Sequence, residues 1–150
     1  MPEVRASCRV PIGPEAAAAT WRNPRRWAAF VEGFQRLEEQ SPDWPAEGAK
    51  VVWQSGPGGR GRVTEKVTSA SPTAFGTLVY EERLVGTQSF RAVEDGDGSR
   101  VEVTLAYELT SESPLKGVTD LLFIRRALRD ALTRTLRRFR VEAEDEAGLR

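Results

Sequence analysis

The side chains of this chain that could do chemistry are a few charged and aromatic residues on otherwise apolar faces. Arg125 shares a helical stripe with Leu121 and Leu128, because each residue turns a helix by about 100°. An unpaired buried charge is very costly, so Arg125 must extend to solvent, pair with a carboxylate of the sheet, or bind a ligand. In the last case its planar guanidinium would hold an anionic or carbonyl oxygen. Leu121, Arg125 and Leu128 are therefore candidate ligand contacts.

Glu65 is the one candidate for proton transfer, and a weak one. It shares a period-two phase with Val63 and Val67, which places it on the inward face of an expected strand as a partner for Arg125. A twisted strand that leaves Glu65 exposed would fit the same pattern. If Glu65 is buried, the low dielectric favours the protonated form of its carboxyl group, which could then act as an acid or a base.

Four aromatic residues also fall on expected strands: Trp53, Tyr80, Phe90 and Tyr107. Aromatic side chains at strand spacing usually fill a core, but in a fold with a cavity they also form a platform for a ligand. Tyr107 has the clearest inward phase, and a buried Tyr hydroxyl needs a hydrogen-bond partner from the protein or from a ligand. All four are therefore candidate ligand contacts as well.

The composition excludes several kinds of site. The chain has no histidine and a single cysteine, Cys8, so Cys/His metal sites and disulfides within the chain are excluded and the commonest general base is missing. Cys8 lies in phase with apolar neighbours and is expected to be an inert, buried thiol. We therefore expect no metal and no cofactor.

Charge and hydropathy indicate no charged partner for the chain as a whole. The 22 basic and 22 acidic residues cancel, which predicts no general attraction to nucleic acid. No apolar run approaches the roughly 20 residues of a membrane span, and the first residues lack the apolar stretch of a secretory signal. We expect a cytoplasmic protein without a transmembrane segment.

The strands that must position these residues follow from apolar periodicity and turn signals. Alternation with a period of two predicts strands at 4–10, 34–39, 49–54, 62–69, 75–84, 88–94 and 101–109. Turns are expected at 56–61, at Gly86 and at 95–98. The last of these turns has the sequence DGDG, which is the strongest hairpin signal of the chain.

Helices are expected at both ends of the chain. Two short helices should follow the first strand, one after Pro14 and one ending at Gly33, with a break before Pro24. A long amphipathic helix should begin at Pro114 and end near Glu144. Its apolar stripe consists of Val118, Leu121, Leu128, Leu132, Leu136 and Phe139. A long helix must bury such a stripe, and the apolar face of the sheet is the only large partner that the chain provides.

The remaining features concern the surface of the long helix and the extent of the domain. Leu122, Phe123 and Ile124 widen the apolar stripe, and they could cover a cavity mouth or contact a second copy of the chain. A basic run follows, formed by Arg126, Arg129, Arg134, Arg137, Arg138 and Arg140. Such runs are usually solvated faces, although some bind acidic partners. We expect one domain over 1–150, with a frayed tail at about 145–150.

The order of these elements resembles the START-like superfamily, also called the helix-grip, Bet v 1-like or SRPBCC fold. Its members begin with a strand, an Ala/Pro turn, a helix, Asp/Asn-Pro and a Trp, to which the segment VRASCRVPIGPEAAAATWRNPRRWAAF is similar. Their penultimate hairpin is similar to FRAVEDGDGSRVEVTLAYEL, and the long terminal helix is the third match. The resemblance implies an α+β helix-grip fold, with a curved antiparallel sheet of about seven strands around the C-terminal helix.

The resemblance also implies a cavity between sheet and helix for a small apolar or aromatic molecule. The hypothesis that we favour is a binding protein without catalysis, working as a monomer or homodimer. One alternative is an enzyme of the polyketide cyclase or dehydratase type, in which Glu65, Tyr107 and Arg125 would act on an aromatic or polyketide substrate. A second alternative is a protein or RNA interaction module that uses the basic run of the last helix.

Overall fold

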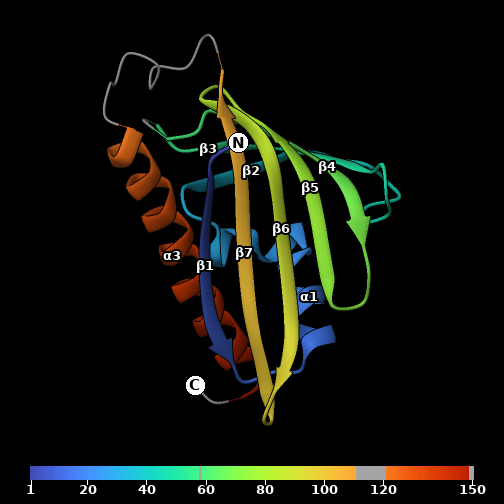
Figure 1. Cartoon of the computed structure of the whole chain (residues 1–150). Coiled ribbons are helices and arrows are strands. Elements are labelled where there is room, and N and C mark those ends of the chain that lie inside the picture. Colours follow the sequence, from blue (N-terminus) through green and yellow to red (C-terminus); the bar gives the residue numbers. More distant parts are fainter. Residues whose placement is uncertain (58, 111–120, 149–150) are drawn as a thin grey trace.

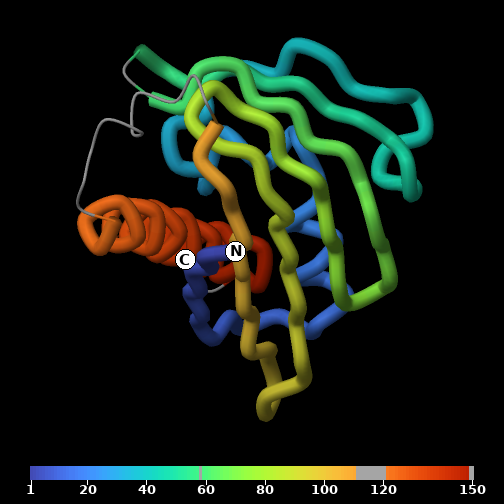
Figure 2. The backbone as a smooth tube through the Cα atoms, turned by 45° about the horizontal axis from the view of Figure 1, so that its top comes forward, coloured from blue at the N-terminus to red at the C-terminus, as the bar shows by residue number. Residues whose placement is uncertain are grey.

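Within the residues that the computed structural model describes, 1–57, 59–110 and 121–148, seven antiparallel strands form one curved sheet. The strand order across the sheet is β1-β7-β6-β5-β4-β3-β2. The strands are β1 (Glu3–Val10), β2 (Phe34–Gln40), β3 (Lys50–Ser55), β4 (Arg62–Ala70), β5 (Ala74–Tyr80), β6 (Leu84–Asp95) and β7 (Gly98–Leu109). The sheet bends around the long helix α3, which runs along the side of β1 (Figures 1 and 2). The predicted α+β helix-grip fold is therefore confirmed.

Three short helical segments connect the first two strands: α1 (Pro14–Trp21), η1 (Pro24–Arg26) and α2 (Trp27–Phe30). Pro14 begins α1, where a missing backbone N–H costs nothing. The Asn23 side chain caps η1 by accepting a hydrogen bond from the backbone N–H of Arg25 at 3.1 Å. Gly33 follows α2 with a φ of 76°, a conformation that glycine adopts without a steric cost.

The hairpin between β6 and β7 confirms one predicted turn, whereas the turn predicted at Gly86 is wrong. Asp95 pairs with Gly98 across the tight turn, and Gly96 has the positive φ that this turn needs. Gly86, however, lies inside β6 and pairs with Tyr107. A Cβ on Gly86 would lie 2.3 Å from the carbonyl oxygen of Ala106, so glycine is required here by close backbone approach. The actual turn is at residues 81–83.

Helix α3 extends from Leu121 to Glu146 within the described residues. The expected helix start at Pro114 and the stripe residue Val118 lie outside the described residues. At its other end the helix reaches two residues beyond Glu144, into the segment that was expected to fray. Glu146 is held there because the Thr20 hydroxyl donates a hydrogen bond of 2.6 Å to its carboxylate. Residues 149–150 of that segment are not described.

The buried face of α3 moves around the helix along its length. Near the start the buried residues are Ile124 and Leu128, whereas Leu136, Phe139 and Ala143 are buried further on. A fixed angular stripe assumes a flat partner, but α3 crosses a curved sheet. A residue near the start of the helix can therefore be exposed even though it shares its angular position with residues that are buried further on. No helix of the described part of the chain is long and apolar enough to cross a membrane.

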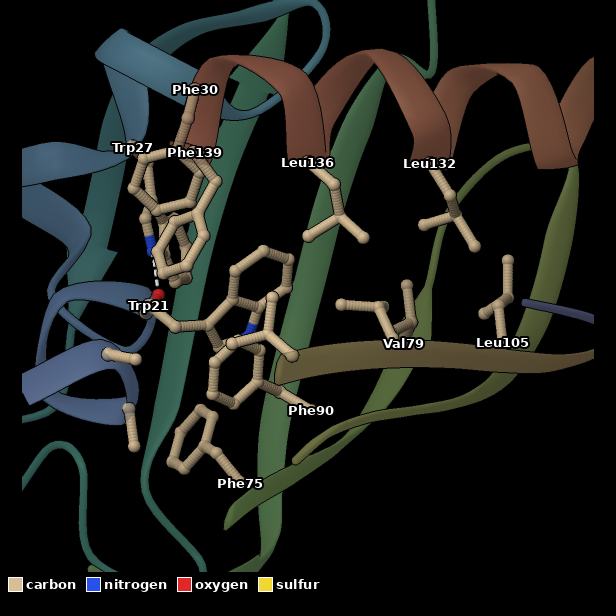
Figure 3. Close-up of a cluster of buried hydrophobic side chains, with 14 of the residues drawn as sticks. Trp21, Trp27, Phe30, Phe75, Val79, Phe90, Leu105, Leu132, Leu136 and Phe139 are labelled. Atoms are coloured by element: carbon tan, nitrogen blue, oxygen red, sulfur yellow. Dashed lines mark hydrogen bonds between the residues drawn. The ribbon is translucent and has the colours of Figure 1, made fainter. Parts of the chain in front are cut away.

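The core contains an aromatic cluster beneath the C-terminal half of α3 (Figure 3). Trp21 stacks on Phe90 with ring centroids 4.9 Å apart, and the edge of Phe139 contacts both Trp21 and Phe30. The indole N–H of Trp27 donates a hydrogen bond of 2.7 Å to the backbone carbonyl of Trp21. These rings come from α1, α2, β6 and α3, so the cluster fixes the short helices against the sheet and the long helix.

Candidate functional site

A cavity of about 370 Å³ lies between the N-terminal half of α3 and the inner face of the sheet. Most of its lining is apolar. Helix α3 contributes Ile124, Leu128, Ala131 and Leu132, the sheet contributes Trp53, Phe75, Leu84 and Leu105, and the short helices contribute Trp21 and Trp27. The volume is within the range of roughly 300–1,000 Å³ that is usual for small-molecule sites. The cavity can therefore hold a small apolar or aromatic molecule.

One wall of the cavity contains a buried carboxylate, Glu65 of β4. The indole N–H of Trp53 donates a hydrogen bond to one of its oxygens at 2.9 Å, and the hydroxyl of Thr77 donates to the other at 3.1 Å. Trp53, Glu65 and Thr77 are neighbours because β3, β4 and β5 are adjacent strands. Glu65 thus presents a hydrogen-bond acceptor to a ligand, and it is the group of this wall that could accept a proton.

Two arginines and one glutamate form a second polar group at the ends of two hairpins. Arg60 lies in the turn between β3 and β4, and Glu81 and Arg83 lie in the turn between β5 and β6. The Glu81 side chain has 0% exposure; it accepts a hydrogen bond from Nε of Arg83 at 3.0 Å and another from Nε of Arg60. All three residues line the cavity. The two cations stabilise a carboxylate that could not be buried alone.

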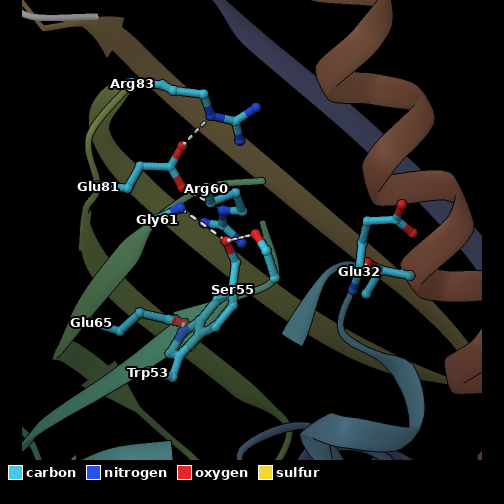
Figure 4. Close-up of polar contacts among 10 residues, drawn as sticks. Glu32, Trp53, Ser55, Arg60, Gly61, Glu65, Glu81 and Arg83 are labelled. Carbon is cyan, nitrogen blue, oxygen red and sulfur yellow. Dashed lines mark hydrogen bonds and ion pairs between the residues drawn. The ribbon is translucent and has the colours of Figure 1, made fainter. Parts of the chain in front are cut away.

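Trp53 lies between these two polar groups (Figure 4). Its N–H points to Glu65, while the guanidinium carbon of Arg60 lies over its ring at 5.0 Å from the centroid. A cation in this position is attracted by the electrons of the ring face. The indole thus holds Arg60 in place on one side and Glu65 on the other.

The opposite side of the cavity mouth is formed by the loop after α2 and by α3. The backbone N–H of Glu32 donates a hydrogen bond of 3.0 Å to the hydroxyl of Thr135. The Glu32 carboxylate accepts hydrogen bonds from Arg134 at 3.2 Å and from Arg138 at 2.8 Å. These contacts attach the loop to the helix. They also show that Arg134 and Arg138 of the basic run pair with a carboxylate of the protein itself.

Three of the predicted site residues line the cavity: Trp53, Glu65 and Leu128. Phe90 and Tyr107 are buried, at 1% and 4% exposure, but neither lines the cavity. Phe90 belongs to the aromatic cluster instead. On β7 the residue that faces the cavity is Leu105, two residues before Tyr107. Strand β7 extends beyond the cavity, and Tyr107 lies on that part of the strand.

The other three candidates do not line the cavity: the inward placement of Tyr80 and Leu121 is wrong, and of the three alternatives for Arg125 its exposure agrees with the one in which it extends to solvent. Tyr80 is 47% exposed because it follows the inward Val79 by one residue on β5 and so points to the outer face. Leu121 is 68% exposed, and Arg125 is also exposed. Both lie on the part of the stripe that the curved sheet no longer covers, and Ile124 takes the inward position. The predicted pair between Glu65 and Arg125 is therefore wrong as well.

The cavity lining also includes Thr77, Arg60, Glu81 and Arg83, which no sequence pattern indicated. Every second turn of an antiparallel meander lies at the same edge of the sheet. The turn at 56–61 joins β3 to β4 and the turn at 81–83 joins β5 to β6, so the two turns meet. The strand predicted from 75 to 84 includes residues 81–83, so the turn at these residues was not predicted. A turn placed at the Glu-Glu-Arg sequence that ends at Arg83 would have brought its charges next to Arg60.

Three further features concern metal ligands, the apolar residues at the start of α3, and Cys8. Among the described residues, no group of three or more Cys, Asp or Glu side chains could hold a metal ion. Phe123 is 60% exposed and lines the cavity mouth, which is one of the two positions expected for the apolar residues at the start of the helix. Cys8 is half-buried, and its thiol donates a weak hydrogen bond to the carbonyl oxygen of Leu136 at 3.8 Å.

Comparisons with known proteins agree with this fold. TTHA0849 from Thermus thermophilus has 17% sequence identity and a TM-score of 0.76, covering 97% of this chain and 99% of its own. Ara h 8.0201 has 10% identity and a TM-score of 0.73, covering 96% and 98%. The di-domain ARO/CYC StfQ from the steffimycin biosynthetic pathway has 12% identity and a TM-score of 0.76, covering 97% of this chain and 51% of StfQ. At these identities the similarity shows the fold alone.

A match to a family model goes further than the structural similarity. No protein with a curated function matches the chain significantly. Residues 1–144, however, match the model of one family, which is described as polyketide cyclase / dehydrase and lipid transport. The predicted resemblance to START-like, SRPBCC-type proteins is confirmed. The chain therefore belongs to the polyketide cyclase / dehydrase and lipid transport family.

Proposed function

We propose that the protein binds a small hydrophobic or aromatic molecule in the cavity between the sheet and α3, and that it does so without catalysis. The cavity itself is the observation that carries this proposal. It is large enough for one small molecule, and its walls are mostly aliphatic and aromatic. Burial of apolar ligand surface against these walls supplies the affinity.

The polar groups of the cavity support binding with a defined orientation. They are concentrated at two places, Glu65 with its two donors and the group formed by Arg60, Glu81 and Arg83. A few fixed polar groups in an apolar lining are typical of small-molecule sites. A ligand with an acceptor at one end and a donor at the other would be bound in one orientation.

The proposal is tested by filling the cavity and leaving the rest unchanged. Ala131 lies on α3 and lines the cavity, so Ala131→Phe would occupy the space of the ligand. Ala19→Phe is the matched control, because Ala19 is an exposed helical alanine away from the cavity. Each protein would be exposed to a cell extract and to the neutral dye N-phenyl-1-naphthylamine. Native mass spectrometry and dye fluorescence would then report what is retained.

We expect the unchanged protein and Ala19→Phe to retain a small molecule and bind the dye, and Ala131→Phe to lose both. Equal retention by Ala131→Phe would place the ligand elsewhere. No retention and no dye binding by any of the three folded proteins would contradict the proposal.

A second candidate function is an enzyme of the cyclase or dehydratase type, and it is favoured by one observation. Glu65 lines the cavity as a buried carboxylate without an ion-pair partner among the described residues. Such a group could remove a proton from a bound substrate. StfQ, which has a similar fold, is an ARO/CYC protein.

Glu65→Gln separates the two functions. The substitution keeps the size of the side chain and an acceptor oxygen, but it removes the ability to take up a proton. A dehydratase would convert the retained molecule to one that has lost water, and a cyclase would convert it to one with a different chromatographic retention time. The variant would retain the molecule unconverted. A binding protein would release the molecule with an unchanged mass and retention time in both cases.

A further inference from the structure

The group at the two hairpin turns has an excess of positive charge. Arg60 and Arg83 each contribute one positive charge, and Glu81, which they share, contributes one negative charge. The side chains of the arginines are 23% and 27% exposed, while that of Glu81 is fully buried. Among the residues that the structure describes, one positive charge of this group is therefore left without a counterion at the wall of the cavity.

The arginines also keep free hydrogen-bond donors. Both contact Glu81 through Nε. Within the described part of the chain, their terminal Nη atoms donate to no other protein group. A guanidinium carries its donors in a planar fork that fits the two oxygens of a carboxylate. The site thus offers donors of the right charge and geometry for a planar anion.

The other acidic side chains near these turns that belong to the described residues do not fill this role. Glu82 has its carboxylate at Gly61 and lines a separate shallow groove on the other side of the turn. Glu65 accepts hydrogen bonds from Trp53 and Thr77, and among the described residues it forms no ion pair with Arg60 or Arg83 (Figure 4). Glu32 pairs with Arg134 and Arg138 on the opposite side of the mouth, where two cations again share one carboxylate.

We propose that the cavity binds an apolar, preferably aromatic, carboxylic acid, whose carboxylate is held by Arg60 and Arg83 while its apolar body lies against Trp53 and α3. This inference rests on the proposed binding function and names the chemical class of the ligand. The apolar body is required because most of the remaining lining is apolar and includes Leu84, Leu128 and Leu132. A small free anion such as acetate would gain only the ionic contact.

The test compares two ligands that differ in charge and hardly in shape, 2-naphthoic acid and 2-naphthamide, at neutral pH. Binding to the full chain would be measured by calorimetry and by quenching of the fluorescence of the tryptophans that line the cavity. We expect the acid to bind about tenfold or more tightly than the amide, as is typical of hydrogen bonds to charged groups. The preference should decrease as salt is added, and acetate alone should give no signal.

The arginines are tested by Arg60→Gln and Arg83→Gln. Each variant should reduce the affinity for the acid by about tenfold and change the affinity for the amide little. Arg91→Gln is the matched control, because Arg91 is exposed on β6 and does not line the cavity. It removes the same charge from the protein and should leave both affinities unchanged. If a variant fails to fold, the preference and salt dependence of the unchanged protein still decide the question.

The outcomes separate this inference from the function on which it rests. Equal binding of acid and amide would overturn the inference and leave the binding function standing. A preference for the acid that survives in both arginine variants would also overturn it, because the anion would then be held elsewhere. Binding of neither naphthalene compound would overturn the inference and count against the proposed function.

Discussion

The two halves of α3 cover two different interiors. Beneath the C-terminal half, Trp21, Phe30, Phe90 and Phe139 fill the space between helix and sheet, with ring centroids 4.9 to 5.8 Å apart. Beneath the N-terminal half lies the cavity of about 370 Å³. The same helix and the same sheet therefore make a packed end, whose rings are drawn in Figure 3, and a hollow end.

The two ends also differ in the polar groups that they bury. The packed end buries the indole N–H of Trp27, which is satisfied by the neighbouring backbone carbonyl of Trp21. The hollow end places two carboxylates, Glu65 and Glu81, in its walls. An empty space forfeits packing contacts and a buried carboxylate costs solvation, so both features reduce stability. Departures from good packing that occur together are expected at functional sites.

The largest effect that we expect is the loss of a ring from the packed end. Phe139→Ala should reduce the free energy of unfolding by about 3–5 kcal/mol, because Phe139 has no exposed surface and contacts three other rings. Leu128→Ala at the hollow end should cost only about 2 kcal/mol, since one side of Leu128 already faces empty space. Urea unfolding measures both values. Equal costs would mean that the hollow end is packed in solution.

The next largest effect on stability is expected at Gly86 of β6. A Cβ at this position would lie 2.3 Å from the carbonyl oxygen of Ala106 and 3.1 Å from Cα of Tyr107. Gly86→Ala should therefore destabilise the protein by about 1–3 kcal/mol through displacement of the backbone. Gly56→Ala is the control, because nothing lies within 4 Å of its added Cβ. Urea unfolding that gives equal stabilities for the two variants would contradict the close approach of β6 and β7.

The packed end could largely be predicted from the sequence. Alternation predicted β1 and β7, the DGDG sequence predicted the hairpin between β6 and β7, and the predicted stripe of α3 correctly included Leu136 and Phe139. All of these are local patterns with a period fixed by the backbone. In the packed end the local pattern and the tertiary contacts agree, so periodicity was sufficient.

The hollow end could be predicted only in part. Glu65 and Trp53 were found because they lie on strands with a clear phase. Arg60, Glu81 and Arg83 lie in turns, which have no period, and they meet only because two hairpins end at the same edge of the sheet. Periodicity left three alternatives open for Arg125, and it could not decide among them because the orientation of Arg125 depends on the curvature of the sheet.

Adding the same side-chain atoms to each end should have opposite effects. Ala18 in α1 has no exposed surface and adjoins the packed end, so Ala18→Leu should cost about 1–3 kcal/mol through overpacking. Ala131→Leu adds the same carbons where the cavity has room, so it should be neutral or slightly stabilising. Both residues are helical, and Leu has almost the helix propensity of Ala, so the comparison isolates packing. Thermal unfolding at matched concentrations would show the difference. A cost for Ala131→Leu equal to that of Ala18→Leu would mean that the added atoms find no space.

The smallest effect concerns Cys8, which reports on the packed half of α3 from β1. Burial raises the pKa of the Cys8 thiol, and the nearby Arg140 and Arg100 offset this only in part. The thiolate is the reactive form, so iodoacetamide should modify the folded protein more slowly than the urea-unfolded chain at the same pH.

The pH midpoint of the reaction of Cys8 in the folded protein should lie above that of the unfolded chain. Because the folded state keeps its proton to higher pH, stability should fall slightly as the pH rises through this interval. Addition of a cavity ligand should leave the rate unchanged, since Cys8 does not line the cavity. A midpoint below that of the unfolded chain would contradict this prediction, because the attraction of the thiolate to Arg140 and Arg100 would then outweigh the effect of burial.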